Sequence, residues 1–325
     1  ATSPDKEQKE QNNDDDSEKN LHYLHLQTSI GRNEVLYSPY QSPEDADTNA
    51  EVDNVVFFGG DVQDFQQYMI KNRTFGEYGD FCLESVCQIL RDKFPSSNIL
   101  LIRPSKQNGY FSIFANFIAN IDKFAQSIPS YKNGTGGQHL NELLANKQLN
   151  GIDKNRLHLI GFSRGVNVLN QLIYETDHRN KHRQHIDKLF KNVHSMYFLD
   201  GGNGARSGSK EDEQRVTMPI DDGVIDHFVR NVMNDGFRFH VYGTSYQWKD
   251  EYRSWIGREQ AYFVDFIKLL KQSDKQKGKQ YFLHHRMYAD NELNESLLRN
   301  NVSKFQTAKD KAIYRHFELL RLFNV

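Results

Sequence analysis

The sequence predicts an α/β fold with a mostly parallel central sheet and helices on both of its faces. Two observations lead to this prediction. Short apolar runs alternate with longer segments in which apolar residues recur every three or four positions, the spacing of an amphipathic helix. The short runs are also apolar throughout, which is typical of parallel strands that are buried on both faces. Such runs predict strands at 54–58, 98–102, 156–160, 193–199, 237–242 and 280–283.

The predicted helices lie between these strands, and the two ends of the chain differ in character. Residues 22–37 predict an antiparallel edge hairpin that turns at Ile30–Asn33. Residues 1–20 contain no large apolar side chain and an acidic run, so we expect a disordered acidic tail there. Residues 21–325 are expected to form a single domain. The helical spacing covers 81–94, 111–128, 139–147, 166–176, 224–234 and 260–271.

Composition excludes several classes of protein. With 41 Lys and Arg against 43 Asp and Glu, the formal charge is −2, so a nucleic-acid partner is not expected. No apolar run approaches the roughly 18–20 residues that a membrane-spanning helix needs. Cys82 and Cys87 lack the C-x-x-C spacing of a zinc or redox motif, and we expect them to be buried on a helix.

The motif Gly161-Phe162-Ser163-Arg164-Gly165 directly follows a predicted strand and directly precedes a predicted helix. This is the setting in which G-x-S-x-G forms the nucleophile elbow of an α/β-hydrolase. The turn is so tight that its flanking positions, Gly161 and Gly165, must be small, and the Ser163 hydroxyl is then presented above the sheet. A plain helix start with Ser163 as N-cap is the alternative interpretation.

A nucleophilic serine needs a base and an acid that orients the base, and in this fold both follow the serine in the chain. Asp250, just beyond the penultimate predicted strand, is slightly favoured as the acid, and Asp200, at the end of the preceding strand, is the alternative. Three histidines are placed to act as the base. They are His284, His285 and His316.

Backbone donors for an oxyanion are predicted at two places. Gly59-Gly60-Asp61 leaves an early strand through two glycines, where an α/β-hydrolase turns a backbone N–H toward the nucleophile. The amides of Gly60 or Asp61 and of Arg164 are therefore the predicted oxyanion hole.

No cofactor and no metal ion are expected. His178, His182 and His185 are interleaved with Arg179, Lys181 and Arg183, and no carboxylate or cysteine is spaced to complete a metal site. Gly134–Gly137 lacks the G-K-[ST] of a phosphate-binding loop and does not follow a predicted strand.

Several separate stretches resemble one eukaryotic family, that of the chromosome-2-open-reading-frame-69 protein, from about residue 50 to the C-terminus. They are Gly59–Gln63, Gly161–Gly165 with Val168–Leu172, Tyr197–Gly202, and Tyr246-Gln247 with Arg253–Glu259. The resemblance implies an α/β-hydrolase-like fold and a mitochondrial location, although no targeting peptide is recognisable in this chain. A His-Phe pair near the family's C-terminus matches His316-Phe317, which favours His316 as the base.

These observations predict a serine hydrolase that acts on an ester, thioester or amide through an acyl-enzyme, with a small acyl compound as substrate. The alternative is a catalytically inactive α/β-hydrolase-like protein that binds or regulates mitochondrial partners, because a fold does not guarantee chemistry.

Overall fold

The computed structural model describes residues 20–42, 51–73, 75–122, 125–132, 134–202, 217–273, 279–300 and 307–325. Of the segment expected to form a disordered tail, 1–20, all but Asn20 lies outside these described residues.

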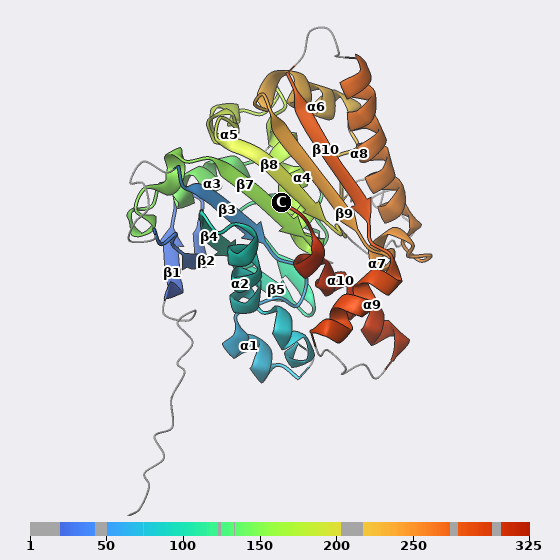
Figure 1. Cartoon of the computed structure of the whole chain (residues 1–325). Helices are drawn as coiled ribbons and strands as arrows, with labels where there is room; N and C mark the ends of the chain where they lie inside the picture. Colours follow the sequence, from blue (N-terminus) through green and yellow to red (C-terminus); the bar gives the residue numbers. More distant parts are fainter. Residues whose placement is uncertain are drawn as a thin grey trace, which may run out of the picture.

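The described chain is built on a sheet of eight strands in the order β1-β2-β4-β3-β7-β8-β9-β10 (Figure 1). Two further short strands, β5 (Lys106–Asn108) and β6 (Phe111–Ile113), form a separate antiparallel hairpin. The strands of the large sheet are β1 (His22–Gln27), β2 (Arg32–Ser38), β3 (Asp53–Phe58), β4 (Ser97–Ile102), β7 (Leu157–Phe162), β8 (Val193–Leu199), β9 (Phe237–Gly243) and β10 (Tyr281–Met287).

Strands β3, β4, β7, β8, β9 and β10 run parallel, whereas β1 and β2 form an antiparallel hairpin at one edge. His22 pairs with Tyr37 and Gln27 with Arg32, which places the hairpin where the sequence predicted it. The mostly parallel sheet with an antiparallel N-terminal edge is thus confirmed, and its strand order is that of an α/β-hydrolase fold.

Helices cover both faces of the sheet. Successive side chains of each strand point to opposite faces, so each strand packs against both helix layers. In β3, Val55 and Phe57 pack into a cluster with α2 and α10, which lie on the near face in Figure 1. Val56 and Phe58 point the other way and pack with α3 and α4. One layer comprises α1 (Gln66–Lys71), α2 (Leu83–Lys93), α9 (Asp290–Arg299) and α10 (Ala308–Leu322), and the other α3 (Gly136–Leu144), α4 (Val166–Glu175), α5 (Arg183–Phe190), α6 (Asp222–His227) and α8 (Ser254–Ser273).

The helix predicted over 111–128 is wrong. Its first residues form β6, and the described residues that follow are turns and irregular backbone. Phe114 and Phe117 are nevertheless buried, and both rings pack edge-on against Phe58. The apolar spacing therefore came from loop residues that insert into the core, a case that periodicity alone does not separate from a helix.

Cys87 lies on α2 and Cys82 is the N-cap residue of that helix; both are buried free thiols, as the sequence predicted. Burial raises the pKa of Cys87 to about 12, so this thiol stays protonated. No helix in the described ranges is long and apolar enough to cross a membrane.

The carboxyl ends of β7, β8 and β9 meet at one edge of the sheet. In Figure 1 the helices α7 (Ser245–Trp248), α9 and α10 gather beside that edge. Ser163 follows β7, Asp200 follows β8 and Thr244 follows β9, so the topology brings three polar side chains to one region. Ligand sites of open α/β sheets lie at this end of the strands.

Candidate active site

Ser163 sits in a sharp bend between β7 and α4. Its φ is +51°, in the left-handed region that a non-glycine residue rarely adopts. Both flanking glycines are required by close approach of the backbone. A Cβ on Gly161 would lie 2.7 Å from the Gly165 carbonyl oxygen, and one on Gly165 would overlap the carbonyl of Phe58. The bend therefore tolerates no side chain at either position.

The loop after β3 presses against Ser163. A Cβ on Gly60 would lie 2.8 Å from the Ser163 Cβ and 3.1 Å from the Phe162 ring. On the other side, the Gly202 N–H donates to the Ser163 carbonyl oxygen at 3.3 Å. Ser163 keeps 6% of its surface exposed, and its hydroxyl has no hydrogen-bonded partner among the described residues.

His316 reaches this region from α10, near the end of the chain. Its ring stacks on Phe162, the residue before Ser163, with 4.5 Å between centroids and 29° between planes. Tyr246 contacts the imidazole with its ring centroid 4.9 Å away. Burial raises the pKa of Tyr246, so this phenol stays neutral. The imidazole thus contacts two aromatic rings, and one of them belongs to the residue before Ser163.

Asp200 is the acid that the structure pairs with His316. The distance from His316 Nδ1 to Asp200 Oδ2 is 2.6 Å, and the two residues are 4% and 0% exposed. Since an ionised carboxylate only accepts, Nδ1 carries the proton in this bond and Nε2 is left to accept one.

Thr244 holds the Asp200 carboxylate in place. Its N–H donates to Oδ1 at 2.8 Å and its hydroxyl to Oδ2 at 2.5 Å. Asp200 itself has a φ of +46°, and its own N–H donates to the Tyr242 carbonyl. Sequence reasoning missed Thr244. Its signal was its position directly after β9, at the same sheet edge as Asp200.

Asp250, the acid slightly favoured from the sequence, makes none of the described hydrogen bonds to His316; the alternative acid, Asp200, makes one. The Asp250 carboxylate accepts from the N–H groups of Tyr252 and Arg253 and pairs with Arg253 Nε at 2.7 Å. Asp250 therefore caps its own turn through these N–H groups, and its charge is paired with the guanidinium of Arg253.

His284 and His285 lie on the edge strand β10 and are both exposed. His284 stacks on His240, whereas His285 stacks on Trp248 with 5.1 Å between centroids. The hydrogen bond to Asp200 is made by His316 instead, so the structure brings neither of these alternative bases to the acid.

The Gly60 amide, one of the predicted oxyanion donors, is already engaged. Its N–H donates to Gln63 Oε1 at 2.7 Å, and Gln63 Nε2 donates to the Phe81 carbonyl at 2.9 Å. Gln63 is fully buried and thereby shapes the loop. The N–H of the next residue, Asp61, has no acceptor within the described ranges. Of the two amides predicted from the sequence, Gly60 and Asp61, the structure thus engages the Gly60 N–H within its own loop.

The side chains of Asp61 and Arg164 form an ion pair across this site. Arg164 Nε and Nη2 donate to the two carboxylate oxygens of Asp61 at 3.2 and 3.1 Å. Arg164 Nη1 also donates to the carbonyl of Ala125 and to Gln126 Oε1. The pair joins the loop after β3 to the residue that follows Ser163.

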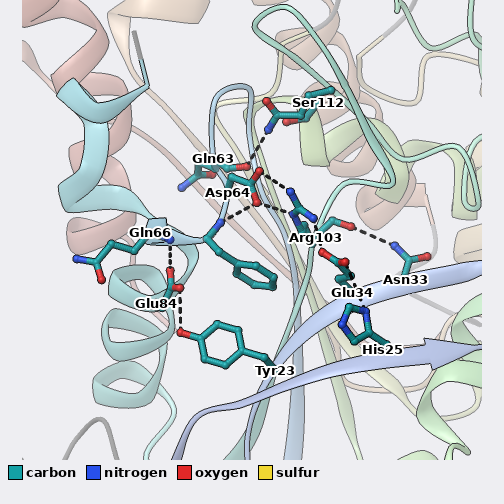
Figure 2. Close-up of polar contacts among 12 residues, drawn as sticks. Tyr23, His25, Asn33, Glu34, Gln63, Asp64, Gln66, Glu84, Arg103 and Ser112 are labelled. Carbon is teal, nitrogen blue, oxygen red and sulfur yellow. Dashed lines mark hydrogen bonds and ion pairs between the residues drawn. The ribbon is translucent and has the colours of Figure 1, made fainter. Parts of the chain in front are cut away.

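Further polar contacts hold the loop from outside, as Figure 2 shows. The Arg103 guanidinium lies between Asp64, at the end of this loop, and Glu34 on β2. Two bonds reach Asp64, at 2.5 and 2.9 Å. Asp64 is also joined through its carbonyl to the Leu83 N–H at 3.0 Å. The loop is therefore anchored to both the edge hairpin and α2.

The sequence matches a known protein family over most of its length. The family model for C2orf69 matches residues 28–151 and 145–274. The chain belongs to the C2orf69 family. The family expected from the sequence motifs is thus confirmed. Ser163 and Asp200 lie within the matched residues, whereas His316 lies beyond them.

The relatives of this C2orf69 family chain are named as mitochondrial proteins. The mouse mitochondrial protein C2orf69 homolog is 27% identical over 276 residues, 69% of this chain and 72% of the relative. The human mitochondrial protein C2orf69 is 28% identical over 270 residues, 66% of each chain. These names confirm the mitochondrial location expected from the resemblance.

Among solved structures, this C2orf69 family member is similar to the carboxylesterase Cest-2923 from Lactobacillus plantarum. The TM-score is 0.48 at 12% identity, over 90% of this chain and 93% of that one. In the described part of the C2orf69 family chain, no three His, Cys, Asp or Glu residues are grouped to hold a metal ion.

Proposed function

We propose that this chain is a mitochondrial serine hydrolase that cleaves an ester, thioester or amide through an acyl-enzyme. Ser163 is the nucleophile, His316 the base and Asp200 the acid that orients it. The observation that carries the proposal is the 2.6 Å bond between His316 Nδ1 and Asp200, formed beside the strained bend at Ser163. A buried carboxylate that fixes the tautomer of an imidazole next to a serine is the arrangement of a catalytic triad.

The residues act in sequence. His316 Nε2 accepts the Ser163 proton as the oxygen attacks the acyl carbonyl, and Asp200 stabilises the imidazolium that forms. The N–H groups of Asp61 and Arg164 donate to the oxyanion of the tetrahedral intermediate. His316 then protonates the leaving group. Water, activated by the same imidazole, releases the acyl group and restores Ser163.

A catalytically inactive binding protein is the second candidate. The observation that favours it is the 6% exposure of Ser163, because a hydroxyl so covered admits only a narrow group. The Ser163 hydroxyl also has no hydrogen-bonded partner among the described residues. Catalytic hydrogen bonds, however, often form fully only when substrate is bound, so the hydrolase remains the better supported function.

The two candidates are separated by a fluorophosphonate probe, which phosphonylates an activated serine. The wild-type chain is expected to be labelled and Ser163→Ala is expected to show no labelling. Mass spectrometry of the labelled peptide then locates the adduct. Labelling that persists in Ser163→Ala would refute the role of Ser163, and an unlabelled, folded wild type would favour the binding protein.

A further inference from the structure

We infer that the ion pair between Asp61 and Arg164 is a positioning device that sets the spacing of the oxyanion hole; this inference rests on the proposed function. Each of the two residues carries one proposed donor amide on its backbone and one half of the ion pair on its side chain. The two amides belong to segments about a hundred positions apart, the loop after β3 and the turn before α4.

The geometry of the pair suits this task. Both carboxylate oxygens of Asp61 accept from the guanidinium, through Nε and Nη2. Such a two-point contact fixes orientation as well as distance, which a single-point contact does not. Backbone donors stabilise a developing oxyanion only when they are held in place before the reaction. A pair that ties the two donor residues together supplies that constraint.

The Arg164 side chain is firmly held in other directions too. Its side chain is 4% exposed, and its guanidinium also donates to the Ala125 carbonyl and to Gln126 Oε1. The guanidinium Cζ lies over the Phe111 ring, 5.0 Å from its centroid. A guanidinium with this many partners is not available to bind a substrate carboxylate. Its charge is instead paired with the Asp61 carboxylate.

Asp61 is also held by the β5–β6 hairpin. Its Oδ1 accepts from the Ser112 N–H at 2.8 Å, and the Ser112 hydroxyl donates to the Gly60 carbonyl at 2.9 Å. The carboxylate therefore accepts hydrogen bonds from both the hairpin and Arg164. The backbone before Asp61 is held as well, because the Gly60 N–H donates to Gln63 Oε1. The position of the Asp61 amide is therefore fixed by contacts of Gly60 and of the Asp61 side chain.

The test compares rates of fluorophosphonate labelling in Asp61→Asn, Arg164→Met and the double variant. Removal of either charge is expected to slow labelling about 10- to 100-fold, part of the loss seen when an oxyanion donor is removed. Because the two side chains act as a unit, the double variant is expected to be no slower than the slower single variant. Arg164→Lys keeps the charge without the fork and is expected to recover part of the rate.

Asp177→Asn is the matched control. Asp177 also accepts two bonds from one guanidinium, Arg179, at 2.8 and 2.7 Å, but it lies just past the opposite end of α4 from Ser163. This control is expected to lower the melting temperature and leave the labelling rate unchanged. If Arg164→Met does not fold, Asp61→Asn, which leaves the guanidinium an amide oxygen, provides the comparison.

Folded single variants that label at the wild-type rate would overturn the ion-pair inference alone. Multiplied losses in the double variant would do the same, since they would mean that the two side chains act independently. A wild type that is not labelled contradicts the proposed function, and the inference fails with it. The two failures are therefore distinguishable.

Discussion

Asp200 and His316 are separated by 116 positions in the chain, yet their side chains meet at 2.6 Å in a buried contact. Asp200 directly follows β8 and has a left-handed φ, and His316 lies on α10. The contact matters because it gives the imidazole one defined tautomer. Its Nδ1 donates to the acid, and Nε2 is left as the proton acceptor.

Asp200→Asn is the substitution that tests this contact most directly. An amide in place of the carboxylate favours the wrong tautomer of His316, so the rate of fluorophosphonate labelling is expected to fall by about 10³–10⁴-fold. Asp250→Asn serves as the control, since Asp250 only caps its own turn and pairs with Arg253. That control is expected to label at close to the wild-type rate. The reverse pattern would restore Asp250 as the acid.

Thr244→Val tests how the acid is oriented. The substitution keeps the shape of the side chain but removes the hydroxyl that donates to Asp200 Oδ2. Of its two bonds from Thr244, the carboxylate then keeps only the one from the N–H. We expect labelling to slow about 10-fold, at the low end of the ~1.5–3 kcal/mol for a hydrogen bond to a charged group. Thr244→Ser, which restores the donor, is expected to recover the rate. Equal rates in the Val and Ser variants would assign the hydroxyl no part in orienting Asp200.

Gly60→Ala probes the close approach of the oxyanion loop to Ser163. The added methyl would lie 2.8 Å from the Ser163 Cβ, so either the loop or the serine must move. We expect labelling to be lost and the free energy of unfolding to fall by about 1–3 kcal/mol. Gly79→Ala is the control, because a Cβ there meets nothing within 4 Å. Labelling rate and urea unfolding measured on both variants check the prediction; an active, stable Gly60→Ala would contradict the packing.

Glu175 is expected to make the stability of the fold depend on pH. Burial raises the pKa of its carboxyl from 4.5 to about 7, although the N–H groups of Gly136 and Gly137 donate to it. The folded state thus holds this proton more tightly than the unfolded chain does. Its contribution to stability is full below pH 4.5 and is lost as the pH rises through about 7.

The measurement is urea unfolding of the wild type and Glu175→Gln from pH 4.5 to 8. Because other groups titrate equally in both proteins, the difference between their free energies of unfolding isolates Glu175. The wild type is expected to lose up to about 3 kcal/mol relative to the variant as the pH rises. Parallel curves would mean that the carboxyl is not perturbed.

The local features of the fold could be predicted because they depend on neighbouring residues. Continuous apolar runs identified the buried parallel strands, and two glycines around Ser163 identified the bend after β7. The same kind of reasoning failed at 111–128, where Phe114 and Phe117 enter the core from a loop. Apolar spacing reports burial, and a loop beside the core satisfies it as well as a helix does.

The sequence by itself determined the sheet, its edge hairpin and the serine at the bend, because hydrophobic period and glycine sterics act over a few residues. Only the tertiary structure decided that Asp200 rather than Asp250 meets His316, that Thr244 supports it, and that Gln63 takes the Gly60 amide. Partner choice among polar side chains depends on which strand ends and loops come within about 3 Å of each other. That distance is set by packing across the whole sheet.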